Sequence, residues 1–328
     1  FSLPELAEIA AQNHHIFKEL QYLSNIDYKP IRYISFAHDE ETYKTLEASK
    51  AWSKAEMIAP KQFREEISPY FNANPKKYIS ALVSEDCWQA TPGKVVDLVR
   101  NLGIAAGGTV MEDCRVLEAC REGKYTSVLV QTHDKKYVEY RTEHFVNALG
   151  SGAGKLCDSM GIDAGLYPVR HQAFITRRLP MLGKHGTNLD MLIDRQDYKG
   201  FSAVYGQQIA YTGQIIGCAS PKLDAMRIDK NLKVNTKAFL EIVSEMFSEW
   251  IPDLAGVGIQ AVWAGYYTEP RYIVDPELGL FVGMRGHGFM LSQYIARMYV
   301  DKLLGRPVPE YFEKLKLNGP GLSEKAFK

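Results

Sequence analysis

The chain has 328 residues, 46% of them hydrophobic, which is enough for two domains or one large α/β unit with a substantial buried core. Its 39 basic and 39 acidic residues balance, and there is no polybasic run, so binding to nucleic acid or to an anionic membrane surface is not expected. No stretch approaches the roughly 20 continuous apolar residues of a membrane span.

The cysteines indicate a reducing compartment. They are scattered without a C-x-x-C pair, and their odd number argues against a complete disulfide framework. We therefore expect a soluble, cytoplasmic protein. The five are Cys87, Cys114, Cys120, Cys157 and Cys218.

The N-terminal region predicts a helix, a strand and a second helix. Residues 3–24 place apolar side chains at helical spacing and predict an amphipathic helix. His14 and His15 in this helix are adjacent and point to different faces, so they do not predict a metal pair. A short strand at 31–36 and a charged helix from Asp39 follow.

The next region predicts one more strand and helix and then a β-meander. The strand covers 78–83 and the helix 94–102. Three β runs follow, at 110–119, 125–132 and 137–146. A charged turn separates the second run from the third, which is typical of an antiparallel meander.

The middle of the chain is again rich in strand signals. Residues 167–217 predict four antiparallel strands. A strong helix follows, with Asn235 or Thr236 as its N-cap and Pro252 beyond its end. Its expected buried face holds Phe239, Ile242, Val243, Met246 and Phe247.

The stretch FVGMRGHGFMLSQYIARMYVDKLLG, residues 281–305, places three glycines within the six positions 283–288, between an apolar strand and an amphipathic helix. Glycine lets the backbone approach another group closely, and the first turn of a helix presents unpaired N–H groups. Small residues at 148 and 150–154 follow another strand end in the same way. Two such places suggest one ligand that lies across both.

Four motifs, in order, resemble the D-amino-acid oxidase superfamily of FAD enzymes, which includes glycine oxidase, sarcosine oxidase and dye-linked proline dehydrogenase. HFVNALGSGAGKLCDSMGI resembles the family run VVNAAGAWS, and PVRHQAFIT resembles P-x-R-G-Q. IQAVWAGYY resembles the AWAG strand, and the stretch 281–305 resembles the run that contains SGHG. Together the motifs cover nearly the whole chain from about residue 80, and their order and spacing carry the resemblance.

This resemblance implies a mixed α/β fold with two domains. A Rossmann-like FAD-binding domain would comprise residues 1–30, 75–165 and 260–328. A substrate domain with an antiparallel sheet would comprise 31–74 and 166–259.

One family feature does not occur in this sequence. The family opens with a strand and a G-x-G-x-x-G turn that seats the ADP half of FAD, and GSGAG at 150–154 lies too late to replace it. With Phe1 in place of an initiator methionine, we expect a segment of about sixty to seventy residues, a βαβ opening and its next loop, to be missing. The alternative is a subunit that has lost this nucleotide-binding half.

The resemblance assigns the flavin to the entrance of the last long helix. A reduced flavin becomes anionic at its pyrimidine edge, and N–H donors at a helix N-terminus stabilise that charge. Arg285 departs from the small residue usual in the family, and it either adds a positive charge near the flavin or points outward. The candidate cofactor residues are Gly283, Arg285, Gly286, His287, Gly288, Phe289, Met290 and Leu291, with Val116, Ala148, Gly150 and Gly152 at the adenosine end. The alternatives are a capped, glycine-rich turn without a ligand and ordinary sheet packing.

The resemblance also implies oxidation of a C–N bond next to a carboxylate, by hydride transfer to flavin N5. Arg271 is the candidate carboxylate clamp, with a surface-loop arginine as the alternative. Tyr266 and Tyr267 alternate faces, so one is expected to line the pocket and the other to pack in the core. His287 would tune the flavin, accept a proton or only pack.

Other residues of the middle region have lesser roles in this interpretation. Tyr205 and Tyr211 are weaker pocket candidates, and Arg170 and Gln172 are expected at the domain junction. The sequence predicts neither a metal site nor a covalent nucleophile.

We therefore predict an FAD-dependent oxidoreductase that dehydrogenates a small amine or amino acid, of the EC 1.4 or 1.5 type. A non-catalytic homologue that serves within a larger assembly is the alternative. The sequence leaves open the substrate, a homo- or hetero-oligomeric state, and whether oxygen, a quinone or a partner flavoprotein takes the electrons.

Overall fold

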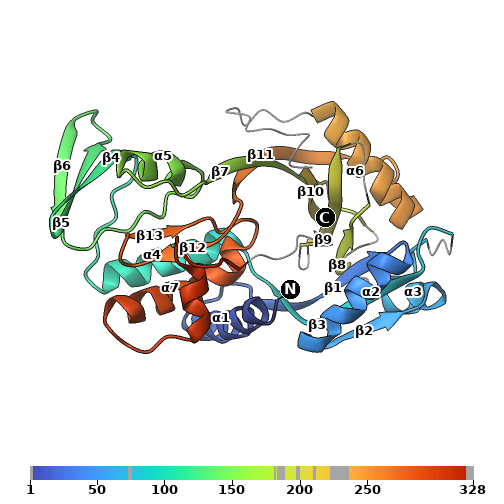
Figure 1. The fold of residues 1–328 in the computed structure, drawn as a ribbon. Coiled ribbons are helices and arrows are strands. Elements are labelled where there is room, and N and C mark those ends of the chain that lie inside the picture. The colour runs from blue at the N-terminus through green and yellow to red at the C-terminus, as the bar shows by residue number, and fades with distance from the viewer. Residues whose placement is uncertain are drawn as a thin grey trace.

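The computed structural model has a mixed α/β fold with one large sheet and two smaller ones (Figure 1), which confirms the predicted fold class. The large sheet forms one half of the molecule, and a bundle of helices with the smaller sheets forms the other. The described residues are 3–72, 76–180, 182, 189–196, 200–209, 212–221 and 236–322.

The large sheet has eight strands in the order β11-β7-β10-β9-β8-β1-β3-β2. Neighbouring strands are antiparallel except β1 and β8, which are parallel. The four antiparallel strands predicted within 167–217 are β7 to β10, so this prediction is confirmed. In chain order the strands are β1 (Lys29–Ala37), β2 (Ala55–Ile58), β3 (Ser80–Gln89), β7 (Tyr167–Thr176), β8 (Met191–Asp194), β9 (Phe201–Gln208), β10 (Ile215–Pro221) and β11 (Ile259–Glu269).

Helix α6 (Thr236–Trp250) covers one face of this sheet. Its five predicted core residues are each at most 5% exposed, and they pack with Phe174 and Val204 of the sheet. The short α3 (Phe63–Glu66) contributes to the same core, whereas α2 (Glu40–Ser49) packs around Leu46 in a separate cluster with Leu82. The predicted N-cap Asn235 lies outside the described residues.

The other half of the molecule is built around two long helices. The predicted N-terminal helix is α1 (Pro4–Leu23), and it packs on α7 (Gly288–Leu303) through a shared core that includes Leu6 and Ile295. Helix α4 (Pro92–Ala105) lies nearby and buries Val95 against α1. The hairpin of β12 (Ile273–Asp275) and β13 (Leu280–Val282) leads into α7, and η5 (Glu310–Leu315) follows it.

The predicted meander forms a separate three-stranded antiparallel sheet of β4 (Arg115–Glu122), β5 (Tyr125–Gln131) and β6 (Tyr137–Thr142). Several of its boundaries differ from the prediction, most at the start of the first strand and at the end of the third. The first strand begins at Arg115 instead of 110, and the third ends at Thr142 instead of 146. The third run ends early because Asn147 leaves the meander and bonds to the backbone of Gly279 and Phe281 beside β13.

The strand predicted at 78–83 is also longer and later than expected. β3 starts at Ser80, and Tyr78 precedes it as a buried side chain whose hydroxyl donates to Asp194 at 3.3 Å. The strand continues to Gln89 because β1 pairs with Ser84 and, beyond a shift in register, with the residues from Cys87 to Gln89. Pairing with a neighbouring strand therefore extends β3 beyond its apolar run.

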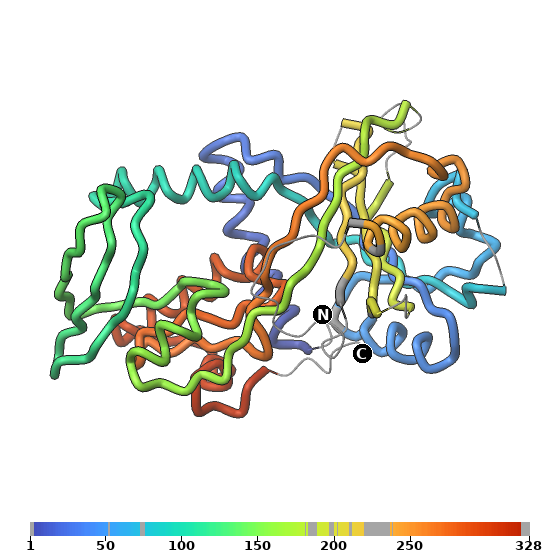
Figure 2. Tube along the Cα trace, turned by 90° about the horizontal axis from the view of Figure 1, so that it is seen from above, coloured from blue at the N-terminus to red at the C-terminus, as the bar shows by residue number. Residues whose placement is uncertain are grey.

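The two halves are joined by β7 and β11, which run side by side along the middle of the molecule (Figure 2). The large sheet takes β3 from the range predicted for the FAD-binding domain, together with most of β11. The proposed division into two domains therefore remains a prediction.

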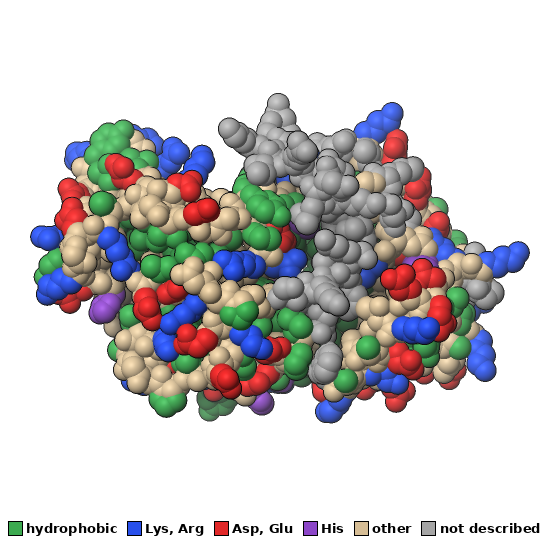
Figure 3. All heavy atoms as spheres, in the orientation of Figure 1, with side chains coloured by type: hydrophobic (Ala, Val, Ile, Leu, Met, Phe, Trp, Pro, Cys, Tyr) green, Lys and Arg blue, Asp and Glu red, His purple; other side chains and the backbone are tan. Residues whose placement is uncertain are grey.

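The half that contains the meander exposes several large apolar side chains (Figure 3). The exposed apolar residues on α4, the meander and the segments beside them are Val96, Val99, Leu102, Ile104, Val110, Met111, Leu117, Val146 and Leu149.

None of the helices in the described part of the chain is long and apolar enough to cross a membrane.

Candidate functional site

The loop between β13 and α7 lies so close to its neighbours that two of its positions accept only glycine. Gly283 has φ of +72°, and a Cβ there would lie 1.9 Å from the carbonyl oxygen of Arg271. A Cβ on Gly286 would lie 2.6 Å from Cε2 of Tyr267. The loop is therefore pressed against β11 and the segment that follows it.

The first turn of α7 presents unpaired N–H groups. No acceptor in the described part of the chain bonds to the N–H of Gly288, Phe289 or Met290, whereas Leu291 bonds to the carbonyl of His287. Phe289 and Met290 are 37% and 36% exposed, and Leu291 is buried. Such an arrangement suits the electron-rich edge of a ligand.

Arg285 holds the same loop to the end of β11. Its φ is +50°, its N–H donates to the Thr268 carbonyl at 3.2 Å, and its Nε donates to Oε2 of Glu269 at 2.7 Å. The two side chains are 18% and 10% exposed. The charge of Arg285 is therefore balanced within the protein, beside the helix entrance.

His287 lies directly before α7 and packs on the core of this half. Its Nδ1 shares a short hydrogen bond of 2.5 Å with the hydroxyl of Tyr272, and the two rings lie nearly parallel, with 20° between their planes. Tyr272 is buried. His287 thus connects the helix entrance to the residues beneath it.

Tyr267 lies between this loop and the large sheet. Its ring stacks on His171 with centroids 3.7 Å apart, and its hydroxyl is 3.3 Å from the hydroxyl of Tyr205. His171 pairs with Gly265, so its contact with Tyr267 is a diagonal cross-strand contact. Tyr266 points to the opposite face of β11, as strand alternation predicts.

Tyr267 and four buried side chains near it are uncharged at neutral pH. Burial raises the pKa of Tyr267, of Tyr205 and of Cys218, the last to about 11, and it raises the pKa of Tyr33 to about 12. Burial lowers the pKa of His171 to about 4. We call these five residues the uncharged wall, and desolvation of the charged form is the main cause in each case.

Sequence reasoning did not select His171, Tyr33 or Cys218, and it ranked Tyr205 as a weak candidate. A signal for His171 was present, because this residue stands where the P-x-R-G-Q pattern has glycine. The other contacts arise only when β9, β10 and β1 join the same sheet. Tyr211 lies outside the described residues.

Arg271 follows the cis bond between Glu269 and Pro270 and reaches toward the C-terminal segment. Its Nη2 donates to the carbonyl of Leu317 at 2.6 Å, and its Nη1 donates to that of Gly319 at 3.5 Å. In this arrangement, Arg271 docks the segment after η5 beside the glycine loop.

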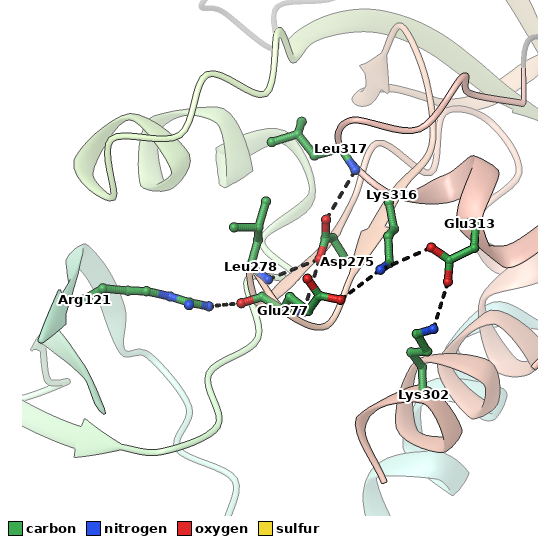
Figure 4. A network of polar contacts seen from close by, with 8 residues as sticks. All are labelled: Arg121, Asp275, Glu277, Leu278, Lys302, Glu313, Lys316 and Leu317. Atoms are coloured by element: carbon green, nitrogen blue, oxygen red, sulfur yellow. Dashed lines mark hydrogen bonds and ion pairs between the residues drawn. The ribbon is translucent and has the colours of Figure 1, made fainter. Parts of the chain in front are cut away.

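A polar network fixes the β12–β13 turn to this C-terminal segment (Figure 4). The Asp275 carboxylate accepts from the N–H of Glu277 at 3.1 Å and, on its other oxygen, from the N–H of Leu317 at 3.4 Å. The network anchors the elements on both sides of α7. Its ion pairs are Lys316–Glu277 at 2.8 Å, Lys316–Glu313 at 3.2 Å and Lys302–Glu313 at 2.8 Å.

Of the residues predicted for the adenosine end, Val116 lies on the meander, and the other three follow Asn147, which bonds to β13. Val116 is half-buried on β4, where it pairs with Val130. Ala148, Gly150 and Gly152 are exposed, and the short η3 (Gly150–Gly152) lies against β11. Both predicted small-residue segments therefore meet the same strand.

Arg170 and Gln172 lie on β7, one of the two strands that join the halves. Gln172 is fully buried and Arg170 is half-buried. No group of three or more potential metal ligands occurs among the residues that the structure describes.

Residues 2–302 match the protein-family model described as FAD dependent oxidoreductase, abbreviated DAO. A comparison with curated proteins gave no match.

Solved structures with a similar fold include L-proline dehydrogenase from P. horikoshii, with 22% identity, a TM-score of 0.78, and coverage of 97% of this chain and 83% of that one. Glycine oxidase from Geobacillus kaustophilus has 16% identity and a TM-score of 0.77, over 95% of this chain and 81% of its own. L-α-glycerophosphate oxidase from Mycoplasma pneumoniae, solved with FAD bound, has 14% identity and a TM-score of 0.67, over 90% and 79%. At these identities the similarity establishes the fold.

Proposed function

The chain belongs to the DAO family of FAD-dependent oxidoreductases, and we propose that it dehydrogenates a small amine or amino acid. Two of the structures with a similar fold are named for the amino acids L-proline and glycine. In this proposal the enzyme is of the EC 1.4 or 1.5 type and removes a hydride from the carbon next to nitrogen.

The entrance of α7 is the observation that carries the proposal. The N–H groups of Gly288, Phe289 and Met290, which bond to no acceptor among the described residues, fit the pyrimidine edge of an isoalloxazine ring. Gly283 and Gly286 keep side-chain atoms away from the same place. FAD, when bound, supplies the two-electron acceptor, with N5 as the atom that receives the hydride.

In this proposal, the residues of the uncharged wall line the place where the substrate binds. An ammonium group loses its hydration when it enters such a site, so binding there favours the neutral amine. The neutral form is also the reactive one, because its nitrogen lone pair assists departure of the hydride from the adjacent carbon. Tyr267 joins the two parts, since it contacts both Gly286 and His171.

Arg271 is the residue predicted to clamp the substrate carboxylate. Its guanidinium donates to two backbone carbonyls of the C-terminal segment. We propose that its main task is to position that segment beside the glycine loop, and that the amine nitrogen is the substrate group that this site recognises.

The proposal is tested with the purified protein and added FAD. We expect a yellow protein with visible flavin absorption, which bleaches without oxygen when at least one of glycine, sarcosine, L-proline or a D-amino acid is added. A folded protein that takes up no FAD would support the alternative, a non-catalytic homologue that serves within a larger assembly. A yellow protein that none of these amines reduces would refute the proposed substrate class.

A further inference from the structure

An open space lies on β11 next to the uncharged wall. Trp263, Gly265 and Tyr267 alternate onto one face of this strand, and a Cβ on Gly265 would meet no atom of the described residues within 4 Å. Trp263 is 42% exposed. We call the space above Gly265, between these two aromatic residues, the Gly265 gap.

His171 is the polar residue directly beside this gap. It pairs with Gly265 across the β7–β11 ladder, so the two residues share a face of the sheet. Its ring stacks on Tyr267, and its Nδ1 is buried with no hydrogen-bond partner in the described part of the chain. Buried polar atoms of proteins nearly always have a partner, so this nitrogen has hydrogen-bonding capacity that the fold leaves unused.

The surroundings of His171 specify the kind of group that can use this capacity. Tyr267, Tyr205 and Cys218 are neutral at neutral pH, and the nearby Arg285 is neutralised by Glu269. His171 is itself neutral, so one ring nitrogen donates a hydrogen bond and the other accepts one. His171 therefore offers a ring nitrogen as a hydrogen-bond acceptor beside the gap, next to aromatic and uncharged side chains.

We infer that His171 contacts the substrate, and that one of its ring nitrogens accepts a hydrogen bond from the N–H of an uncharged amine bound in the Gly265 gap. This inference rests on the proposed function and assigns its substrate-binding group. It also gives a reason for a histidine where the family pattern has glycine, since glycine has no side chain to accept the bond.

The first test compares three variants of the FAD-loaded protein. His171→Phe keeps a flat ring on Tyr267 but removes both nitrogens, His171→Gln keeps a hydrogen-bonding group, and His133→Phe removes an exposed histidine in the β5–β6 turn. We expect H171F to weaken binding of glycine, sarcosine or L-proline by roughly ten- to hundredfold. We expect H133F to match the wild type and H171Q to stay within about fivefold of it.

The second test removes the hydrogen from the ligand instead of the acceptor from the protein. N,N-dimethylglycine and N-methyl-L-proline have no N–H in their neutral forms. Binding is followed through the change in flavin absorption, and we expect wild type and H171F to bind these tertiary amines within about twofold of each other. Loss of aromatic packing alone would weaken both series of amines equally.

The outcomes separate this inference from the proposed function. A wild type that takes up FAD but responds to no amine refutes both. If the wild type responds to an amine and H171F binds that amine equally well, only the role of His171 is refuted. The same holds if H171F loses as much affinity for the tertiary amines as for the amines that carry N–H.

If H171F or H171Q folds but loses FAD while H133F keeps it, His171 serves the cofactor, and the inference is wrong. If H171F does not fold, H171Q decides: the inference requires it to keep the preference for amines that carry N–H.

Discussion

Single atoms determine which residue the α7 entrance accepts at position 283. Two separate constraints apply to Gly283: a positive φ, and the carbonyl of Arg271, which occupies the place of a side chain. Gly305, just beyond α7, shares the positive φ at +69°, but a Cβ there would meet nothing within 4 Å in the part of the chain that the structure describes. Substitutions at Gly283 and at Gly305 therefore distinguish the effect of backbone strain from that of steric overlap.

We expect Gly305→Ala to lower the free energy of unfolding by about 1 kcal/mol, the usual strain of a left-handed residue. We expect Gly283→Ala to lower it by about 3 kcal/mol or more, because the overlap with Arg271 adds to the same strain. Urea unfolding at neutral pH measures both. Equal losses in the two variants would show that the loop moves away from Arg271 at little expense.

The ion pair of Arg285 and Glu269 holds the loop before α7 to the end of β11. Both side chains are largely buried, so Glu269→Gln leaves a guanidinium charge without its partner. We expect a loss of about 3 kcal/mol in unfolding free energy, and a smaller loss when Arg285→Met is added to it. A double-mutant cycle from urea unfolding measures the coupling. Additive losses would mean that the pair contributes nothing to holding the loop.

The free energy of unfolding should depend on pH through the protonation of His171. Its pKa falls from about 6.5 in the unfolded chain to about 4 in the fold, so the unfolded chain binds the proton more readily between these values. The contribution of the neutral ring is complete above pH 6.5 and is lost as the pH falls toward 4. Between pH 7 and pH 5 we expect the wild type to lose about 2 kcal/mol more than His171→Phe. Parallel urea curves at the two pH values check this, and identical pH dependences would contradict it.

At the scale of elements, α1 and α7 form one unit although they lie at opposite ends of the chain. Leu6 of α1 is fully buried in the core that it shares with α7, and the Asn13 side chain accepts from the Tyr294 N–H at 2.8 Å. Leu23, in the last turn of α1, is 61% exposed. The position of α7, and with it the helix entrance, thus depends on one face of α1.

We expect Leu6→Ala to lower the free energy of unfolding by about 2–5 kcal/mol, because it leaves a cavity beneath α7. Leu23→Ala in the same helix should change it by less than about 0.5 kcal/mol. Chemical denaturation followed by circular dichroism compares the two. A small effect of L6A would mean that the core closes around the missing side chain.

The spacing of apolar residues predicted those elements whose structure depends on their own sequence. The buried face of α6 was read correctly from its apolar spacing, and the meander from its three β runs. Strand ends were read less well, because β3 and β6 end where their partners end and not where their apolar runs do. A single sequence does not show which strands pair with each other.

The candidate site was only partly visible in the sequence for the same reason. The glycines before α7 stand in a row and can be read directly, and so can the alternation of Tyr266 and Tyr267. The stack of His171 on Tyr267 joins residues of β7 and β11 that are far apart in the chain, and it depends on their register. The docking of Arg271 on Leu317 and Gly319 likewise needs the folded C-terminal segment.

At the scale of the whole molecule, cofactor binding should appear as stability. A ligand that binds only the folded state adds about 2.7 kcal/mol when its concentration is a hundred times its dissociation constant. We expect saturating FAD to raise the melting temperature by several degrees, since about 1 kcal/mol corresponds to about 2–4 °C in chains of comparable size. Thermal denaturation with and without FAD measures this. AMP at equal concentration is the control, because it lacks the isoalloxazine ring that the α7 entrance would hold.

β7 and β11, which run between the halves, also carry two residues of the candidate site. His171 lies on β7 and Tyr267 on β11, within the stretch where these strands pair. A hinge motion of one half against the other must bend or twist this ribbon, and the spacing of the two stacked rings would change with it. Motion between the halves and substrate recognition would then be mechanically coupled through the two rings.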